Sequence, residues 1–270
     1  MESIVAQTRE LKSGYSIPVL GLGTWDLRGS TCERVVSEAV DVGYQHLDTA
    51  EMYGNEADIG RIVSKVDRRS LFITSKVGAS HLQKDALLDA CSKSLDRLQT
   101  DYLDLYLVHW PSETVPLEET MDGMQQLVQQ GMVRSVGVSN FETTLLRQAI
   151  EVSEIPICNN QVEFHPYKNQ SEFLRFCRQR RVTLTAYSPL ARGRIAKDEK
   201  LASIAENYGV TPAQVSLRWL LQKGTIVIPK ASSREHLVAD AELGGWELTD
   251  EQMDAIDQIS VPTRSGSVAS

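Results

Sequence analysis

Short β-rich runs alternate with amphipathic helical runs along the chain, and this alternation limits the possible folds more than any other feature of the sequence. Several of the β-rich runs are almost continuously apolar, as is typical of strands that are buried on both faces of a sheet. The pattern predicts eight strands, at residues 19–23, 44–48, 71–75, 102–108, 133–138, 158–162, 182–186 and 226–229. Such an alternation is expected to give an α/β fold around a parallel sheet.

Helical periodicity fills the segments between the predicted strands. Residues 84–98 carry an apolar stripe at a period of about 3.6 residues, formed by Leu87, Cys91, Leu95 and Leu98. A similar stripe starts at Leu117 in the next unit. These stripes predict helices that pack one face against the sheet.

Two cap motifs predict further helices near the end of the chain. Thr211 and Gln214 have the spacing of a capping box, with Pro212 at the first helical position. Thr249 and Gln252 repeat this spacing. The first motif predicts an extra helix before the last strand, which explains the longer gap there, and the second predicts a helix after it.

Eight strand–helix units in 270 residues favour a single (β/α)8 barrel over residues 1–270, with an extra helix before and after the last strand region. Residues 260–270 are predicted to form a flexible tail. A doubly wound sheet is the competing α/β fold. Gly21-Leu22-Gly23 lacks the third glycine of a dinucleotide-binding loop, and the sequence has no P-loop, so the barrel is preferred.

Charge and composition exclude several classes of protein. The net charge of −8 argues against a nucleic-acid partner, which would require a basic face. No apolar run is long enough to span a membrane, and the first ten residues lack the apolar region of a signal peptide. The four cysteines form no C-x-x-C pair, which favours reduced thiols in a cytoplasmic protein. No metal site is expected, because no ligand spacing links His46, His81, His109, His165 and His236.

Polar side chains follow almost every predicted strand, and the active sites of barrels lie at these strand ends. They are Asp48, Tyr53, Lys76, His109, Ser139, Asn140, Gln161, Tyr187, Ser188 and Lys230. Taken alone, each has a structural explanation: a turn for Asp48, a core-edge position for Tyr53, a solvated strand end for Lys76, a structural hydrogen bond for His109, and a helix cap before Glu142 for Ser139 and Asn140. Their convergence in a barrel instead predicts a set of groups for proton transfer.

The chemistry of this set can be derived from the residue types. Tyrosine is a poor acid at neutral pH, and a cation beside Tyr53 would lower its pKa. Lys76 could be that cation, and Asp48 could supply the counter-charge that a buried lysine requires. His109 could orient a carbonyl oxygen that Tyr53 protonates. Because no side chain can donate a hydride, the set implies a redox cofactor.

Three stretches of the sequence resemble signatures of the aldo-keto reductase superfamily. The first runs over residues 43–56 and contains Asp48 and Tyr53, the second is Gly-Val-Ser-Asn-Phe at 137–141, and the third is Ile-Pro-Lys at 228–230. Matches extend from Gly21 to Thr249. The chain is most similar to short prokaryotic-type members such as 2,5-diketo-D-gluconate and methylglyoxal reductases.

This resemblance implies a monomeric enzyme that reduces small aldehydes and ketones with NADPH bound across the C-terminal face of the barrel. Its catalytic tetrad would be Asp48, Tyr53, Lys76 and His109, with Tyr53 as the general acid. Residues implied to contact the cofactor are Gly23, Thr24, Trp25, Asp48, Ser139, Asn140, Gln161, Tyr187, Ser188 and Leu190. Ser139, Asn140 and Gln161 would hold the nicotinamide carboxamide, and Tyr187 would stack on its ring. The structural alternatives are a buried, satisfied amide for Gln161 and core packing for Tyr187.

The predicted phosphate site opens a helix and contains Lys230, Ser232, Ser233, Arg234 and His236. Ser232 and Glu235 also have the spacing of a capping box, and a helix N-terminus with cations nearby favours anions. Many family members carry arginine where this chain has His236. Since histidine is mostly neutral at pH 7, we expect NADPH to be preferred with weaker discrimination against NADH.

The substrate pocket is expected to be walled by Trp25, Tyr53, His109 and Trp110. Gly78 stands where the family often has a tryptophan, and the segments after Trp110 and Ile259 are short. These departures predict an open pocket for small or flexible carbonyls. Methylglyoxal, aldoses, aromatic aldehydes and diketo acids are all compatible with it.

Two other functions use the same barrel. One is a regulatory or partner subunit that binds NADPH with little turnover, as the potassium-channel β subunits of the superfamily do, although the intact tetrad disfavours it. The other is a lyase or isomerase that forms a Schiff base on Lys76. That role requires a neutral amine, whereas Lys76 beside Asp48 is expected to be charged.

Overall fold

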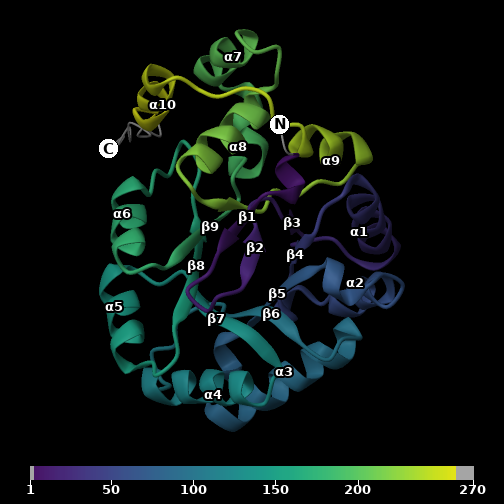
Figure 1. Cartoon of the computed structure of the whole chain (residues 1–270), viewed down its shortest axis with the longest axis vertical. Helices are drawn as coiled ribbons and strands as arrows, with labels where there is room; N and C mark the ends of the chain where they lie inside the picture. Colours follow the sequence, from purple (N-terminus) through teal and green to yellow (C-terminus); the bar gives the residue numbers. More distant parts are fainter. Residues whose placement is uncertain (1–2, 260–270) are drawn as a thin grey trace, which may run out of the picture.

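The fold is a closed barrel of parallel strands surrounded by helices (Figure 1). The computed structural model describes residues 3–259, so the predicted tail at 260–270 lies outside the described residues. The eight strands lie in the order β3-β4-β5-β6-β7-β8-β9-β10. Backbone hydrogen bonds join the first strand to the last, from Gly21 N to Val227 O and from Gly23 N to Pro229 O, both at 2.9 Å. These bonds close the sheet and confirm the predicted (β/α)8 barrel.

Every predicted strand is present, although the first, the second and the last are shorter than expected. The strands are β3 (Leu22–Gly23), β4 (His46–Asp48), β5 (Phe72–Val77), β6 (Leu103–Val108), β7 (Val133–Ser139), β8 (Ile157–Glu163), β9 (Thr183–Tyr187) and β10 (Ile226–Val227). The predicted strand at 19–23 exceeds β3 because Leu20 meets Val227 of β10 only through an isolated bridge.

The helices form the outer layer of the barrel (Figure 1). They are α1 (Gly29–Val42), α2 (Glu56–Val63), α3 (Lys84–Leu98), α4 (Leu117–Gln129), α5 (Thr143–Val152), α6 (Ser171–Gln179), α7 (Glu199–Glu206), α8 (Pro212–Gln222), α9 (Arg234–Ala241) and α10 (Asp250–Asp257). The predicted stripe of α3 is buried, at Leu87, Cys91, Leu95 and Leu98. The sequence therefore located both the helix and its inner face.

Both predicted capping boxes near the end of the chain are present. Thr211 caps α8 together with Gln214, and Thr249 caps α10 together with Gln252. In each box the threonine side chain accepts from the backbone of the glutamine, whose side chain accepts from the threonine backbone. Helices α8 and α10 are the extra helices expected before and after the last strand.

Two other caps, which were considered as structural explanations of their residues, are not formed. Helix α5 starts at Thr143 with Glu142 as its N-cap, so Ser139 and Asn140 do not cap it. Helix α9 is capped by Ser233, whose side chain accepts from the backbone of His236, rather than by Ser232 with Glu235. The spacing in each stretch allowed a cap, but the backbone enters the helix at a different residue.

A hairpin that the sequence analysis did not predict lies across one end of the barrel (Figure 1). It pairs β1 (Thr8–Glu10) with β2 (Ser16–Pro18) in antiparallel fashion. Two of its buried side chains, Leu11 and Ile17, belong to the same apolar cluster as Phe72, Leu105, Leu107, Cys158 and Ile226 of the barrel strands. The hairpin and this cluster fill the centre of that end of the barrel with apolar side chains.

One glycine allows two barrel strands to approach closely just before the site. A Cβ atom on Gly137 would lie 2.5 Å from the backbone oxygen of Asn159 and 2.7 Å from a methyl group of Leu107. The pairing of β7 with β8 also shifts register between Val136 and Gly137. Glycine at this position lets β7 continue to Ser139 beside Gln161.

Candidate active site

A buried ion pair links the ends of β4 and β5. Lys76 Nζ donates to Asp48 Oδ1 at 2.5 Å and to Thr49 O at 2.8 Å. The Lys76 and Asp48 side chains are 0% and 2% exposed. Burial lowers the pKa of Lys76, but the charge of Asp48 and the nearby Tyr53 outweigh it and raise that pKa above its ordinary value. Lys76 is therefore a buried cation, which rules out the solvated strand end and argues against a Schiff-base lysine.

Tyr53 ends the short 3-10 helix η2 (Glu51–Tyr53) and lies beside this pair. Its hydroxyl oxygen is 3.4 Å from Lys76 Nζ. Burial is the strongest influence on Tyr53 and raises its pKa, while the Lys76 charge lowers it only in part and Asp48 raises it again. The expectation of a lowered pKa is wrong, because the sequence does not reveal how deeply the phenol is buried. Tyr53 carries its proton at neutral pH.

His109 follows β6 directly and faces Tyr53. The two ring centroids are 5.6 Å apart, and the rings meet edge to face. Burial and the charge of Lys76 lower the pKa of His109 to about 3. The imidazole is therefore neutral at physiological pH. Asn140 Nδ2 donates to the backbone oxygen of His109 at 3.1 Å, which ties the end of β6 to the end of β7.

Asp48, Tyr53 and His109 line a cavity of about 280 Å³ at the carboxyl ends of the strands, whereas the buried Lys76 is not part of the lining. All four predicted pocket residues, Trp25, Tyr53, His109 and Trp110, line it. So do most of the residues assigned to the cofactor, namely Gly23, Asp48, Ser139, Asn140, Gln161, Tyr187, Ser188 and Lys230. Met52, Arg192 and Ile228 complete the lining and were not predicted. Trp25 and Trp110 are about half exposed, so the mouth of the cavity has two open aromatic faces.

The three residues predicted to hold the nicotinamide carboxamide, Ser139, Asn140 and Gln161, lie together in the structure. One of them, Gln161, also contacts the ion pair. Gln161 Nε2 donates to Asp48 Oδ2 at 2.7 Å, and Ser139 Oγ donates to Gln161 O at 2.8 Å. Tyr187 donates its hydroxyl to Asn140 Oδ1 at 3.0 Å. Gln161 is thus a buried amide with a hydrogen-bond partner, as its structural alternative stated, and it is also part of the cavity wall. Both carboxylate oxygens of Asp48 are held by buried donors.

The remaining residues assigned to the cofactor do not line this cavity. Thr24 is buried and donates its hydroxyl to Asp48 O at 2.9 Å, and Leu190 packs against the core. Ser232, Ser233, Arg234 and His236 lie at the start of α9.

Three charged residues near this region were missed by the sequence analysis. Asp26 Oδ2 lies 3.5 Å from Lys230 Nζ, so this lysine has an anionic partner in the protein. Arg34 donates to the backbone oxygen of Ser232 at 3.1 Å, which adds a third cation near the start of α9, beside Arg234 and Lys230. Arg192 lines the cavity, with its guanidinium carbon 5.8 Å from the ring centroid of Trp25. A sequence gives no direct signal for Asp26 or Arg34, because each acts through residues distant in the chain.

Asn55 is a further residue that the sequence analysis did not single out. It is fully buried, and its Nδ2 donates to the backbone oxygens of Thr24 and Leu27 at 2.9 Å each. Its Oδ1 accepts the hydroxyl of Thr49 at 2.8 Å, and Thr49 O is an acceptor for Lys76. One amide therefore connects the loop that carries Trp25 with the segment that holds the ion pair. The signal was present in the first signature, where Asn55 follows Tyr53 by two positions.

Comparison with known proteins identifies the family. The family model described as "Aldo/keto reductase family" matches residues 19–261. The chain belongs to the aldo/keto reductase family. It is therefore an oxidoreductase enzyme, and the resemblance found in its signatures is confirmed.

Relatives cover nearly the whole chain. It is 41% identical to an aldo-keto reductase of Mycobacterium ulcerans over 94% of this chain and 91% of that protein. It is 38% identical to a glyoxal reductase of Bacillus subtilis over 98% and 97% of the two chains. The crystal structure of a Bombyx mori aldo-keto reductase in complex with NADP superposes with a TM-score of 0.89, at 31% identity over 95% and 93% of the chains.

Two findings concern residues 3–259 as a whole. No helix among them is long and apolar enough to cross a membrane. Within the same residues, no group of three or more His, Cys, Asp or Glu side chains could hold a metal ion.

The position of Asn55 predicts a large effect on stability. We expect Asn55→Ala to lower the free energy of unfolding by about 2–4 kcal/mol, because two buried carbonyl groups and one hydroxyl lose their partner. Urea denaturation followed by circular dichroism measures this change. The matched control is Asn207→Ala, at an exposed asparagine that bonds only Ser203 O, for which we expect about 0.5 kcal/mol or less. Equal losses in the two variants would contradict the proposed connecting role of Asn55.

Proposed function

We propose that this protein reduces small aldehydes and ketones to alcohols with NADPH, and that Tyr53 supplies the proton. The observation that carries the proposal is the 3.4 Å distance between the Tyr53 hydroxyl and Lys76 Nζ, beside a cavity that Tyr53 and His109 line. The glyoxal reductase of Bacillus subtilis and the NADP complex of the Bombyx mori relative support the substrate class and the cofactor.

The residues present fit a nicotinamide cofactor. The cavity wall beside the tetrad carries the hydroxyl of Ser139 and the amides of Asn140 and Gln161, which between them both donate and accept hydrogen bonds, as a carboxamide requires. The ring of Tyr187 lines the same wall and suits stacking.

The start of α9 suits the anionic end of the cofactor. This end of the helix presents backbone N–H groups, and Arg234 and Arg34 lie there with Lys230 nearby. When bound, NADPH would supply the hydride. We propose that Ser232, Ser233 and His236 contact its 2′-phosphate.

In this proposal the protein's own groups manage the proton and the charge. Neutral His109 donates a hydrogen bond that orients the carbonyl oxygen of the substrate. As negative charge develops on that oxygen, Tyr53 transfers its hydroxyl proton to it. Lys76 stabilises the resulting phenolate, since its ammonium group already lies within reach of the Tyr53 oxygen. Asp48 keeps Lys76 charged, and Gln161 holds the second carboxylate oxygen of Asp48.

The raised pKa of Tyr53 is compatible with this role. An acid must hold its proton until the oxygen of the substrate becomes basic, and an alkoxide is far more basic than a phenolate. Burial therefore keeps Tyr53 in the correct state before the reaction, and Lys76 offsets part of the cost of the phenolate afterwards.

Three further features complete the proposal. The open cavity with exposed Trp25 and Trp110 suits small or flexible carbonyl compounds. The four cysteines are all buried and unpaired, which fits a reducing compartment, and we place the enzyme in the cytoplasm. The proposed reaction needs no group from a partner subunit, and we propose that the enzyme is a monomer.

Removal of the Tyr53 hydroxyl tests the reaction. We expect Tyr53→Phe to lower kcat for glyoxal reduction by about 10²–10⁴-fold, because the proton donor is lost. NADPH absorbance measures turnover, and quenching of protein fluorescence measures NADPH binding, which should change little. Tyr15→Phe, at an exposed tyrosine of the hairpin, is the matched control and should keep full activity. Wild-type protein that binds NADPH but oxidises it with no carbonyl compound would instead support a regulatory subunit.

His236 provides a test of cofactor choice. We expect the ratio of kcat/KM with NADPH to kcat/KM with NADH to be below about a thousandfold in the wild type, and His236→Arg to raise it by about tenfold or more. The cause is a permanent charge at the start of α9 that pairs with the 2′-phosphate, which NADH lacks. Gln130→Arg adds the same charge at the exposed C-cap of α4 and should leave the ratio unchanged. An unchanged ratio in His236→Arg would contradict this assignment.

A further inference from the structure

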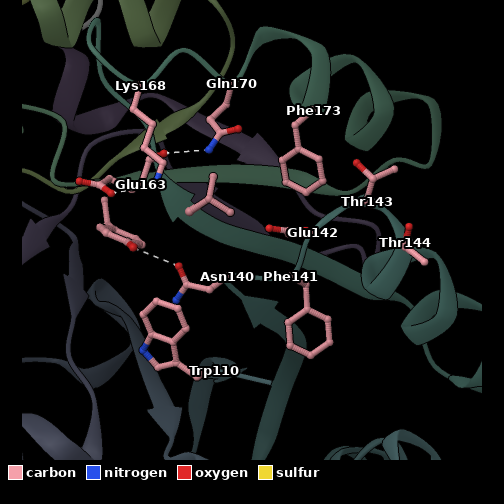
Figure 2. Close-up of a pocket in the computed structure, with 12 residues that line it drawn as sticks. Trp110, Asn140, Phe141, Glu142, Thr143, Thr144, Glu163, Lys168, Gln170 and Phe173 are labelled. Carbon is pink, nitrogen blue, oxygen red and sulfur yellow. Dashed lines mark hydrogen bonds and ion pairs between the residues drawn. The ribbon is translucent and has the colours of Figure 1, made fainter. Parts of the chain in front are cut away.

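A second and larger cavity adjoins the candidate active site. Its volume is about 520 Å³, and it lies between the segments that follow β7 and β8 (Figure 2). The two cavities share three lining residues, Trp110, Asn140 and Tyr187. A ligand that reaches past these side chains would therefore occupy both cavities at once.

Aromatic and apolar side chains form the sides of this second cavity. Figure 2 shows Phe173 of α6 on one side, with Phe141 and Trp110 on the other. Val162 of β8 also lines it. Phe173 is held in place by stacking on Phe176, with the ring centroids 6.1 Å apart and an angle of 11° between the planes. Aromatic faces on two sides suit a flat ring, which gains from burial and from ring–ring contact.

Polar groups at the rim determine the preferred charge of such a ring. Lys168, the lysine of this cavity, is already paired with Glu163 at 2.9 Å, and His165 also contacts that carboxylate at 3.3 Å. Gln170 donates to the backbone oxygen of Glu163 at 3.2 Å, so its carbonyl oxygen remains an acceptor. A ligand carboxylate would have to compete with Glu163 for Lys168.

The rim of the cavity formed by the start of α5 carries the carboxylate of Glu142 and the hydroxyl groups of two threonines. Glu142 makes no ion pair within residues 3–259, and Thr143 and Thr144 follow it at the start of α5. The Glu142 carboxylate repels an anionic ligand and accepts hydrogen bonds from hydroxyl groups. The rim therefore favours a neutral ring that carries hydroxyl groups over an acidic one.

We propose that this cavity is a second substrate subsite, which binds a neutral hydroxylated aromatic ring at the far end of a carbonyl substrate. The subsite rests on the proposed function, because the aldehyde or ketone end of the same molecule lies in the tetrad cavity. It extends the substrate class from small carbonyls to phenol-bearing aldehydes with a flexible linker. Trp110, which lines both cavities, contacts such a substrate between its two ends.

Direct binding tests the subsite without any turnover. The probes are 4-propylphenol and 4-propylbenzoate, which have similar shapes and differ in charge at pH 7. Calorimetry on the whole protein is expected to give at least about tenfold tighter binding of the phenol. Tighter binding of the benzoate, or no binding of the phenol, would overturn the proposal.

A blocking variant assigns that binding to this cavity. Thr144→Trp places a large side chain at an exposed position of the lining and is expected to weaken phenol binding by at least about tenfold. Gln148→Trp, at an exposed residue of the same helix that does not line the cavity, is the matched control and should bind as the wild type does. Equal binding by the two tryptophan variants would place the phenol elsewhere and overturn the proposal.

Substrate kinetics then link the subsite to the reaction. The matched substrates are pentanal and 5-(4-hydroxyphenyl)pentanal. Thr144→Trp is expected to raise KM for the ring-bearing aldehyde by about tenfold and to leave kcat and the pentanal constants within about twofold, because the lost contact acts on binding alone. Equal effects on both aldehydes would contradict a distal subsite. If the phenol binds and Thr144→Trp abolishes this binding, but neither aldehyde is reduced, then the proposed function fails while the binding site remains supported.

Discussion

The buried pair of Lys76 and Asp48 is the interaction on which the rest of the site depends. Transferring two charges from water into a protein interior costs several kcal/mol for each ion, and mutual attraction repays this only if the remaining hydrogen-bonding groups are satisfied. Here Thr49 O accepts from Lys76, and Gln161 donates to Asp48. These partners come from segments far apart in the sequence, so the pair can exist only in the closed barrel. Tyr53 and His109 both acquire their proton-binding properties from this cation and from their burial beside it.

The barrel provides the partners of this ion pair by placing apolar packing at one end of its axis and the polar site residues at the other. The hairpin of β1 and β2 seals one end with an apolar cluster, and the carboxyl ends of the strands carry the polar groups at the other. Between these ends, Asn55 joins the loop bearing Trp25 to the segment bearing Thr49, and Gly137 lets β7 approach β8 closely. The second cavity lies beside this polar end and is lined by residues of α5 and α6. A larger substrate gains contacts there without disturbing the ion pair.

Most of the fold followed from the sequence because parallel strands and their helices have strong, local hydrophobic patterns. The hairpin was missed because each of its strands has only three residues, so its buried residues, Leu11, Ile17 and Pro18, form no periodic pattern. The residues of the tetrad were found because each one ends or follows a strand. Their electrostatics were predicted only in part, since the direction of the Tyr53 pKa depends on burial, which no motif encodes. Asn55 and Arg34 act through backbone groups of distant segments, and such contacts leave no spacing pattern in the chain.

The central claim is that burial keeps Tyr53 protonated beside a charged Lys76 until a carbonyl oxygen takes its proton. The most direct measurement is a pH titration of protein containing tyrosine labelled with ¹³C at Cζ, with the Tyr53 signal assigned from its absence in Tyr53→Phe. The account predicts that Tyr53 remains a phenol up to and beyond the ordinary tyrosine pKa of 10.0. Ionisation of Tyr53 below about pH 9 would show that the Lys76 charge outweighs burial, and would contradict the account.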